Sequence, residues 1–188
     1  MYKRCITEQS AQRQRQLTAG FLDMMARECY DDITVSSFCE HMNIPRKSFY
    51  RYFSSKEGAL YALLDNAVLD FQGEVFTDDA KATQETLERF FLYWKSQEKL
   101  LSVLEQNGLI GTLFQRAISK TISDDLISHK LQPFFHGYPP EYIIMFLSSG
   151  LLSMVVQWHH NHYPLSPAQM ATMAAHLLSQ PMLKLKAK

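Results

Sequence analysis

The chain has 188 residues, of which 46% are hydrophobic and 12% aromatic. This composition supplies enough apolar material for a sizeable core and excludes a disordered chain. Seven glycines and seven prolines are too few for the many tight turns of an all-β protein. The 19 basic and 19 acidic residues cancel, so net charge alone indicates neither a nucleic-acid nor a membrane partner.

The three cysteines have no CxxC spacing and are odd in number, which argues against a disulfide framework or a zinc ribbon and suits a reducing cytosol. Residues 1–16 contain no apolar segment typical of a signal peptide. The longest apolar run, residues 143–158, is short and serine-rich for a membrane span. We therefore expect a soluble, cytoplasmic protein without a membrane partner.

The first predicted helix covers residues 8–29, because Leu17, Phe21, Met24 and Met25 form one apolar stripe at helical spacing. A second, short helix follows Thr34 and ends near residue 42. The Thr34 hydroxyl is a natural N-cap, since it can accept from a free amide of the first turn.

Residues 43–45 predict a sharp turn, because Asn43 tolerates the left-handed conformation and Pro45 suits the first position of a helix. A third helix is expected over residues 45–53, with Phe49 and Phe53 facing inward and the basic side chains facing outward. Ser54 and Glu57 then have the spacing of a capping box that opens a fourth helix reaching Val75.

Longer helical patterns follow over residues 87–94, 99–108, 109–132, 141–160 and 167–180, and Ser166 and Gln169 have the spacing of a second capping box. The sequence therefore predicts an all-α protein of about nine helices. We expect an N-terminal three-helix helix-turn-helix domain over residues 8–68 and a C-terminal helical domain for ligand binding and dimerisation over residues 69–188.

Residues 43–56 contain four basic and four aromatic residues and no acid. In a helix-turn-helix the second helix enters the major groove and presents its N-terminal residues to base edges. Those residues are Arg46 and Lys47, which can each pair with guanine O6 and N7. The hydroxyls of Ser48, Tyr50 and Tyr52 suit phosphate oxygens. Lys56, in the first turn of the fourth helix, suits an anion there.

Residues 33–60, ITVSSFCEHMNIPRKSFYRYFSSKEGAL, resemble the DNA-binding domain of the tetracycline-repressor (TetR/AcrR) family of bacterial transcriptional regulators. The shared pattern is a Thr that opens helix two, a small-residue turn, a Tyr within helix three, and Phe-x-x-Lys before helix four. Asn43 and Cys39 depart from the family's usual Gly and Ala. The resemblance implies that nine residues contact DNA: Thr34, Ser36, Arg46, Lys47, Ser48, Tyr50, Arg51, Tyr52 and Lys56.

The predicted helix over residues 141–160 is apolar nearly all round and must be buried. It can be buried within its own domain or in a homodimer, and we favour a four-helix interface made with residues 167–180 of both protomers. The family uses this arrangement, and a palindromic operator requires it. The expected interface residues are Phe146, Gly150, Ser153, Met154, Met170 and Leu177.

A ligand pocket for a small apolar effector is a further expectation, although aromatic residues at helical spacing are more often plain core. The candidate pocket residues are Phe91, Trp94, Phe114 and Phe146. No cofactor is expected. No catalytic residue and no metal site is expected either, since His159 and His160 diverge by about 100° on a helix and the paired acids suit helix starts.

These expectations combine into one function. The chain is predicted to be a non-enzymatic, homodimeric regulator of transcription, in which an effector controls repression at a palindromic operator on double-stranded DNA. The alternative is a co-activator or protein-interaction module of the same fold, without a small-molecule ligand.

Overall fold

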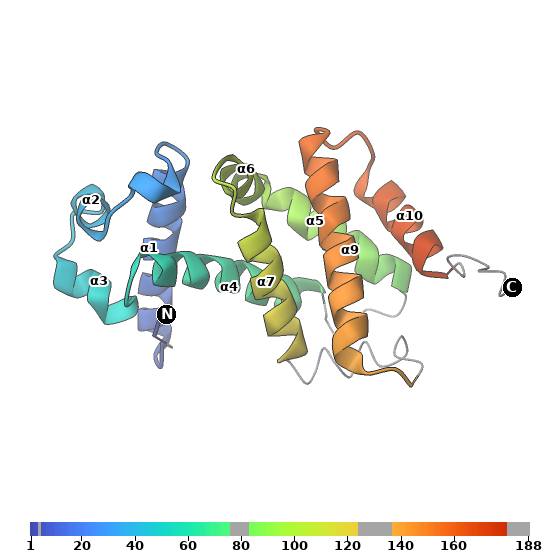
Figure 1. The fold of residues 1–188 in the computed structure, drawn as a ribbon, viewed down its shortest axis with the longest axis horizontal. Coiled ribbons are helices and arrows are strands. Elements are labelled where there is room, and N and C mark those ends of the chain that lie inside the picture. Colours follow the sequence, from blue (N-terminus) through green and yellow to red (C-terminus); the bar gives the residue numbers. More distant parts are fainter. Residues whose placement is uncertain (4, 76–82, 124–136, 180–188) are drawn as a thin grey trace, which may run out of the picture. The chain divides into compact units, whose positions relative to one another are not determined.

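The computed structural model describes residues 1–3, 5–75, 83–123 and 137–179. Nine α-helices and one short 3-10 helix lie in these ranges, and the one β-bridge there, between Tyr2 and Phe53, is isolated. The predicted all-α class is therefore confirmed (Figure 1).

Contacts between residues divide the chain into two compact units. The first unit combines Met1–Leu69 with Lys99–Ser123, and the second combines Asp70–Glu98 with Asp124–Lys188. This division describes compactness. The predicted functional division into residues 8–68 and 69–188 stays a prediction.

The first unit is built on α1 (Glu8–Met25), the 3-10 helix (Tyr30–Asp32), α2 (Val35–His41), α3 (Arg46–Tyr52) and the first part of α4 (Lys56–Val75). Its core is aromatic. The rings of Phe21 and Phe38 are 5.5 Å apart, and those of Phe38 and Phe49 are 5.6 Å apart. All three side chains are 1% exposed, so α1, α2 and α3 share one buried cluster.

Two helix starts differ from the prediction. Pro45 is the N-cap of α3 and lies outside the helix, with an extended backbone. At α4 the cap is Ser55, whose Oγ accepts from the Gly58 amide at 3.2 Å. Ser54 instead donates from its amide to the Met1 carbonyl at 3.1 Å. The first helix is also shorter than expected, because it ends at Met25.

Helices α6 (Glu98–Gln106) and α7 (Ile110–Ile122) lie almost entirely in the first unit. Asn107, just after α6, connects them to the end of α1. Its Nδ2 donates to the carbonyl of Met25, the last residue of α1, at 3.4 Å, and its Oδ1 accepts from the Tyr30 amide of the 3-10 helix at 2.6 Å. An ion pair between Lys99 and Asp23 adds a second link to α1. The predicted extension of α7 to residue 132 falls mostly outside the described residues.

The second unit contains α5 (Thr83–Ser96), α9 (Pro140–His160) and α10 (Pro167–Ser179), and α5 packs against both others (Figure 1). The rings of Phe91 and Trp158 meet edge to face, with centroids 5.7 Å apart. The predicted capping box of α10 is confirmed, because the Ser166 amide donates to Gln169 Oε1 at 2.8 Å and the Gln169 amide to Ser166 Oγ at 3.2 Å.

Among the described helices, α9 is long and apolar enough to span a membrane by length and composition, with a mean hydropathy of 1.3. One side of it is nevertheless core, since Ile144, Leu152, Val155 and Trp158 are all buried. The other side carries exposed apolar residues, including Tyr142 at 67% and Phe146 at 58%. Helix α9 is thus buried on one side within its own unit.

Candidate nucleic-acid interface

Helices α2 and α3 are joined by a turn whose geometry follows from its residues. Thr34 caps α2, because its Oγ1 accepts from the Ser37 amide at 3.1 Å. Asn43 adopts a left-handed backbone with φ of 49°, as its position in the turn predicted. The Ile44 amide then donates to the Cys39 carbonyl at 2.9 Å. These contacts fix where α3 begins relative to α2.

Helix α3 has one buried and one exposed side. Phe49 is 1% exposed and anchors the helix in the core. The side chains of Arg46, Lys47, Tyr50 and Arg51 are all exposed. No acid lies between Glu40 and Glu57, so no carboxylate of this segment opposes an approaching phosphate.

Arg46 is held by α2. Its Nη2 donates to the Ser36 hydroxyl across an open hollow lined by Ser36, Cys39, Glu40 and residues 43–46. Burial raises the pKa of the Cys39 thiol above its usual value, although the charge of Arg46 opposes this shift. The thiol is therefore neutral at physiological pH, and the charged side chains that line the hollow are Arg46 and Glu40.

Lys56 has partners within the protein. Its Nζ donates to the Tyr30 carbonyl at 2.8 Å and the Asp31 carbonyl at 3.2 Å, and it lies 4.4 Å from the centroid of the Tyr30 ring. An ammonium has three donors, so one remains for a phosphate while these two bonds hold. The amine thus ties the start of α4 to the 3-10 helix.

The nine predicted DNA-contacting residues differ in exposure. Tyr52 is 9% exposed and belongs to the core, so its ring is a poor candidate for a phosphate contact. Three are half-buried: Ser36, Ser48 and Lys56. Five are exposed: Thr34, Arg46, Lys47, Tyr50 and Arg51. The structure brings the exposed residues to one end of the first unit, on α2 and α3 (Figure 1).

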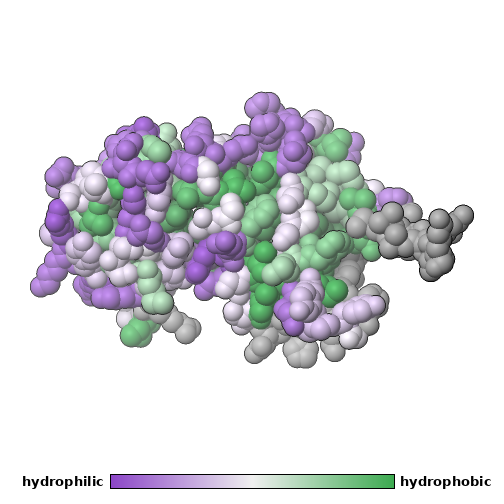
Figure 2. Space-filling view, viewed as in Figure 1, coloured by the Kyte–Doolittle hydropathy of each residue, from purple (hydrophilic) through white to green (hydrophobic). Residues whose placement is uncertain are grey.

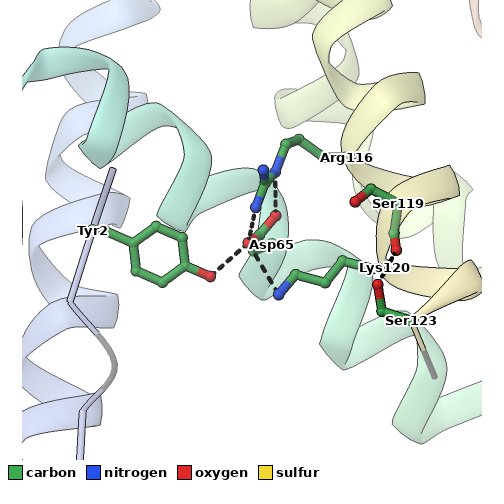
Figure 3. A network of polar contacts seen from close by, with 6 residues as sticks. All are labelled: Tyr2, Asp65, Arg116, Ser119, Lys120 and Ser123. Carbon is green, nitrogen blue, oxygen red and sulfur yellow. Dashed lines mark hydrogen bonds and ion pairs between the residues drawn. The ribbon is translucent and has the colours of Figure 1, made fainter. Parts of the chain in front are cut away.

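A polar network in the same unit was missed by the sequence analysis (Figure 3). Asp65 on α4 is 0% exposed. It accepts from Arg116 Nε at 2.6 Å and from the Tyr2 hydroxyl at 2.5 Å, and it lies 3.3 Å from Lys120 Nζ. The spacing of Arg116 and Lys120 places both on one face of α7, but this spacing does not identify the acid that they meet.

The protonation states in this network follow from its contacts. Burial of Asp65 opposes its ionisation, but hydrogen bonds from Arg116 and Tyr2 and the charges of Arg116 and Lys120 outweigh burial and hold the pKa of the carboxyl below its usual value. Burial, with the hydrogen bond to Asp65, raises the pKa of the Tyr2 phenol. The network therefore contains one carboxylate, two cations and one neutral phenol at physiological pH.

The candidate pocket residues are divided between the two units. Phe91 and Trp94 on α5 are 0% and 1% exposed. Phe146 on α9 is exposed, and Phe114 on α7 is half-buried in the other unit. The Trp94 Nε1 and Gln72 Nε2 atoms of the second unit are buried and have no hydrogen-bond partner among the described residues, and buried donors of this kind require an explanation.

The candidate interface residues of the second unit lie mostly at its surface. Gly150, Ser153 and Leu177 are exposed, together with Phe146, and Met154 is half-buried. Met170 is 3% exposed and packs in the core of the unit, so its side chain is not presented to a partner. Figure 2 has the same view as Figure 1, where α9 is labelled, and it shows hydrophobic residues at the surface over this helix.

Within the described residues no group of three or more His, Cys, Asp and Glu side chains has the arrangement of a metal site. His159 Nδ1 lies 2.8 Å from the Tyr163 hydroxyl, and His160 is exposed. His129 and His136, which are near these residues in sequence, lie outside the described residues.

The capped α2, the left-handed turn and the exposed basic face of α3 define a helix-turn-helix protein of the DNA-binding class. A family model described as a transcriptional regulator C-terminal region, TetR_C_8, matches residues 81–180. The chain belongs to the TetR family of transcriptional regulators, whose members bind DNA and are not enzymes.

Several solved structures share this fold. The fatty acid degradation regulator FadR from Bacillus halodurans has a TM-score of 0.64 at 17% identity, covering 90% of this chain and 96% of that one. A tetR-family regulator from Streptomyces coelicolor has a TM-score of 0.56 at 20% identity, covering 89% and 78%.

The repressor AlkX from Dietzia sp. strain DQ12-45-1b, implicated in biodegradation of n-alkanes, has a TM-score of 0.56 at 13% identity, covering 88% of this chain and 92% of that one. None of the curated proteins matches the chain in sequence. At these identities the structural likenesses establish the fold.

Proposed function

We propose that the chain is an effector-controlled repressor that binds a palindromic operator as a homodimer in the cytoplasm. The observation that carries the DNA-binding part is the face of α3, where Arg46, Lys47, Tyr50 and Arg51 are exposed opposite the buried Phe49. A helix of this kind fits the major groove with its N-terminal residues toward base edges.

The position of each residue on α2 or α3 determines whether it is proposed to contact bases or phosphates. Arg46 and Lys47, at the first turn of α3, face bases, where each bidentate pair with guanine is worth about 1–3 kcal/mol of discrimination. Thr34, Ser36, Ser48 and the Tyr50 hydroxyl contact phosphates, which fix register without reading sequence. Arg51 and Lys56 add charge to the same backbone contacts.

The homodimer is supported by the exposed apolar side of α9 and α10. A single recognition helix reads too few base pairs to find one site in a genome, so useful specificity needs two half-sites. Two-fold symmetry then requires one self-complementary surface. Phe146 at 58% and Leu177 at 45% exposure supply apolar area for it. A Cβ on Gly150 would meet nothing within 4 Å, which leaves room for a second backbone.

Effector control is assigned to the second unit. The unpartnered Trp94 Nε1 and Gln72 Nε2 are buried donors, and a ligand that carries a hydrogen-bond acceptor on an apolar body would satisfy them. An effector that favours a conformation with the two recognition helices out of register lowers DNA affinity, and DNA reciprocally lowers effector affinity.

The decisive experiment is selection of duplexes from a random pool by the wild-type protein and by Arg46→Ala and Lys47→Ala. Wild type is expected to select a palindrome. Each variant is expected to lose preference at one or two positions per half-site, at a cost of about 1–3 kcal/mol for each lost pair.

Selection of no common sequence by the wild type would refute sequence-specific binding. Unchanged selectivity in both variants would move base reading to other residues, with Arg51 the next to test. A protein that binds its operator equally with and without apolar small molecules, yet retains a large apolar surface, would favour the interaction-module function.

A further inference from the structure

Residues 1–3 run antiparallel to the end of the recognition helix. Tyr2 pairs with Phe53 in an isolated β-bridge, and the Lys3 amide donates to the Tyr52 carbonyl at 2.9 Å. The last carbonyls of a helix have no donor within the helix. Lys3 therefore supplies a donor that α3 lacks and fixes the position of its C-terminal end.

The start of α4 packs closely against residues 1–3. The Ser54 amide donates to the Met1 carbonyl at 3.1 Å. Gly58 lies against the Met1 backbone, and a Cβ at position 58 would overlap the Met1 carbonyl. Gly58 thus provides the close approach that residues 1–3 need, although glycine is a poor helix former.

The side chain of Tyr2 turns toward α4 (Figure 3). Its hydroxyl donates to Asp65 Oδ2 at 2.5 Å. Arg116 on α7 donates to both oxygens of the same carboxylate, with Nε 2.6 Å from Oδ1. One buried carboxylate therefore receives bonds from residues 1–3 and from α7.

The bonds that Asp65 receives from Arg116 and Lys120 have a different effect from the bond that it receives from Tyr2. A buried carboxylate must be paired and hydrogen-bonded, and Arg116 and Lys120 already supply charge to Asp65. The bond from the neutral Tyr2 phenol is not needed to neutralise that charge. Its main effect is to hold residues 1–3, and through them the end of α3, against α4.

We propose that Tyr2 and Asp65 are positioning residues for the recognition helix. Asp65 holds Tyr2, the backbone beside Tyr2 holds the end of α3, and the arginine on α7 fixes the carboxylate in place. This inference rests on the proposed function for its effect on DNA, because it assumes that α3 reads the operator.

The first test does not involve DNA. Tyr2→Phe removes the hydroxyl and keeps the ring, and amide hydrogen exchange measured by NMR reports on the backbone. The Lys3 and Ser54 amides are expected to exchange roughly two- to tenfold faster than in wild type, the range that one hydrogen bond supports. Unchanged exchange at both amides would overturn the proposal.

Tyr61→Phe is the matched control. Tyr61 lies on α4 with its ring centroid 5.1 Å from the Arg116 guanidinium carbon, so it neighbours the same network. It forms no hydrogen bond with the described residues 1–3. Its exchange rates at Lys3 and Ser54 are expected to equal those of wild type. Faster exchange in this control, equal to that of Tyr2→Phe, would also overturn the assignment to Tyr2.

The second test measures function. Tyr2→Phe is expected to weaken binding to the selected operator roughly two- to tenfold, with an unchanged salt slope and unchanged affinity for random duplex. The loss of one hydrogen bond also lowers the urea midpoint slightly, so the two kinds of binding are compared at urea-free conditions where both proteins are folded. A merely structural role would instead weaken both kinds of binding. Wild-type operator affinity in the variant would overturn the positioning role. If wild type itself selects no operator, the proposed function fails, while the exchange experiment still decides the contact.

Gly58→Ala provides an independent variant that leaves the network residues intact. Alanine favours a helix more than glycine does, so any loss of order at residues 1–3 comes from the overlap with Met1. Faster exchange at Lys3 and weaker operator binding are expected. Retained protection at Lys3 would overturn the packing of residues 1–3 on α4.

Discussion

At the scale of single residues, the cationic side chains near the recognition helix differ in the partners they have within the protein. Arg46 donates to Ser36, and Lys56 donates to two carbonyls of the 3-10 helix. Lys47 and Arg51 are exposed. A residue that already has intramolecular partners must give them up, or share its donors, before it contacts DNA. Its substitution therefore affects stability and binding together.

Lys56→Ala tests this for the start of α4. The change removes two bonds from a charged donor and the contact with the Tyr30 ring. After discounting for solvent access, the free energy of unfolding is expected to fall by about 1 kcal/mol, measured by urea denaturation. Lys47→Ala is the control and is expected to stay within about 0.5 kcal/mol of wild type.

The same Lys56 variant reports on the predicted phosphate contact. If the third donor of Lys56 reaches a phosphate, the slope of log affinity against log salt falls by about one. An altered base preference with an unchanged slope would contradict this role. Equal urea midpoints for the two lysine variants would contradict the structural role.

At the scale of elements, local sequence signals predicted the helices well. Where a predicted helix cap or end differs from the structure, a long-range contact accounts for the difference. The caps at Thr34 and Ser166 and the left-handed Asn43 were predicted and are confirmed, because each depends on neighbours within a few residues. Ser54 was wrong as a cap, since Met1, 53 residues away in sequence, takes its amide and hydroxyl.

The Asp65 network was not predicted for the same physical reason. Tyr2 and Arg116 are 63 and 51 residues from Asp65, and a single sequence carries no signal for pairing at such separations. The end of α1 was misplaced too. The carbonyl of its last residue, Met25, accepts from Asn107 Nδ2, which is 82 residues away in sequence. The exposed face of α3 was predictable from helical spacing alone, whereas the burial of Tyr52 was not.

Thr34 allows a test at this scale, because its side chain caps α2 and is also a proposed phosphate contact. Thr34→Ala is expected to lower the free energy of unfolding by about 1 kcal/mol, and Thr34→Ser, which keeps the hydroxyl, by much less. Urea denaturation measures both. If the alanine and serine variants unfold at the same midpoint, the capping bond does not contribute to stability.

At the scale of the whole molecule, the two compact units carry different proposed functions. The first contains the helix-turn-helix and the Asp65 network, and the second contains the exposed apolar side of α9 and α10. Among the described residues, that apolar surface is open to water. The proposed two-fold dimer would bury it and would supply two recognition helices.

Gly150→Glu tests the assembly. A charge on the exposed face of α9 should prevent the contact without altering the first unit, giving a folded monomer that keeps weak non-specific DNA affinity and loses operator binding. Gly111→Glu on α7 is the control, since its position is also exposed, with nothing within 4 Å of a Cβ.

Sedimentation decides the outcome. Wild type and Gly111→Glu are expected at the mass of a dimer and Gly150→Glu at half of it. A wild-type protein that sediments as a monomer across micromolar concentrations would contradict the dimer, and with it the control of operator binding through the spacing of two recognition helices.

The chain's two tryptophans, Trp94 and Trp158, both belong to the second unit. Intrinsic tryptophan emission is therefore an optical probe of the second unit alone, while the helix-turn-helix emits through tyrosine. Operator DNA that merely docked on α3 would leave the tryptophan spectrum unchanged. A shift in that spectrum on adding operator would be a label-free signal that occupancy of the DNA site is transmitted to the other half of the molecule.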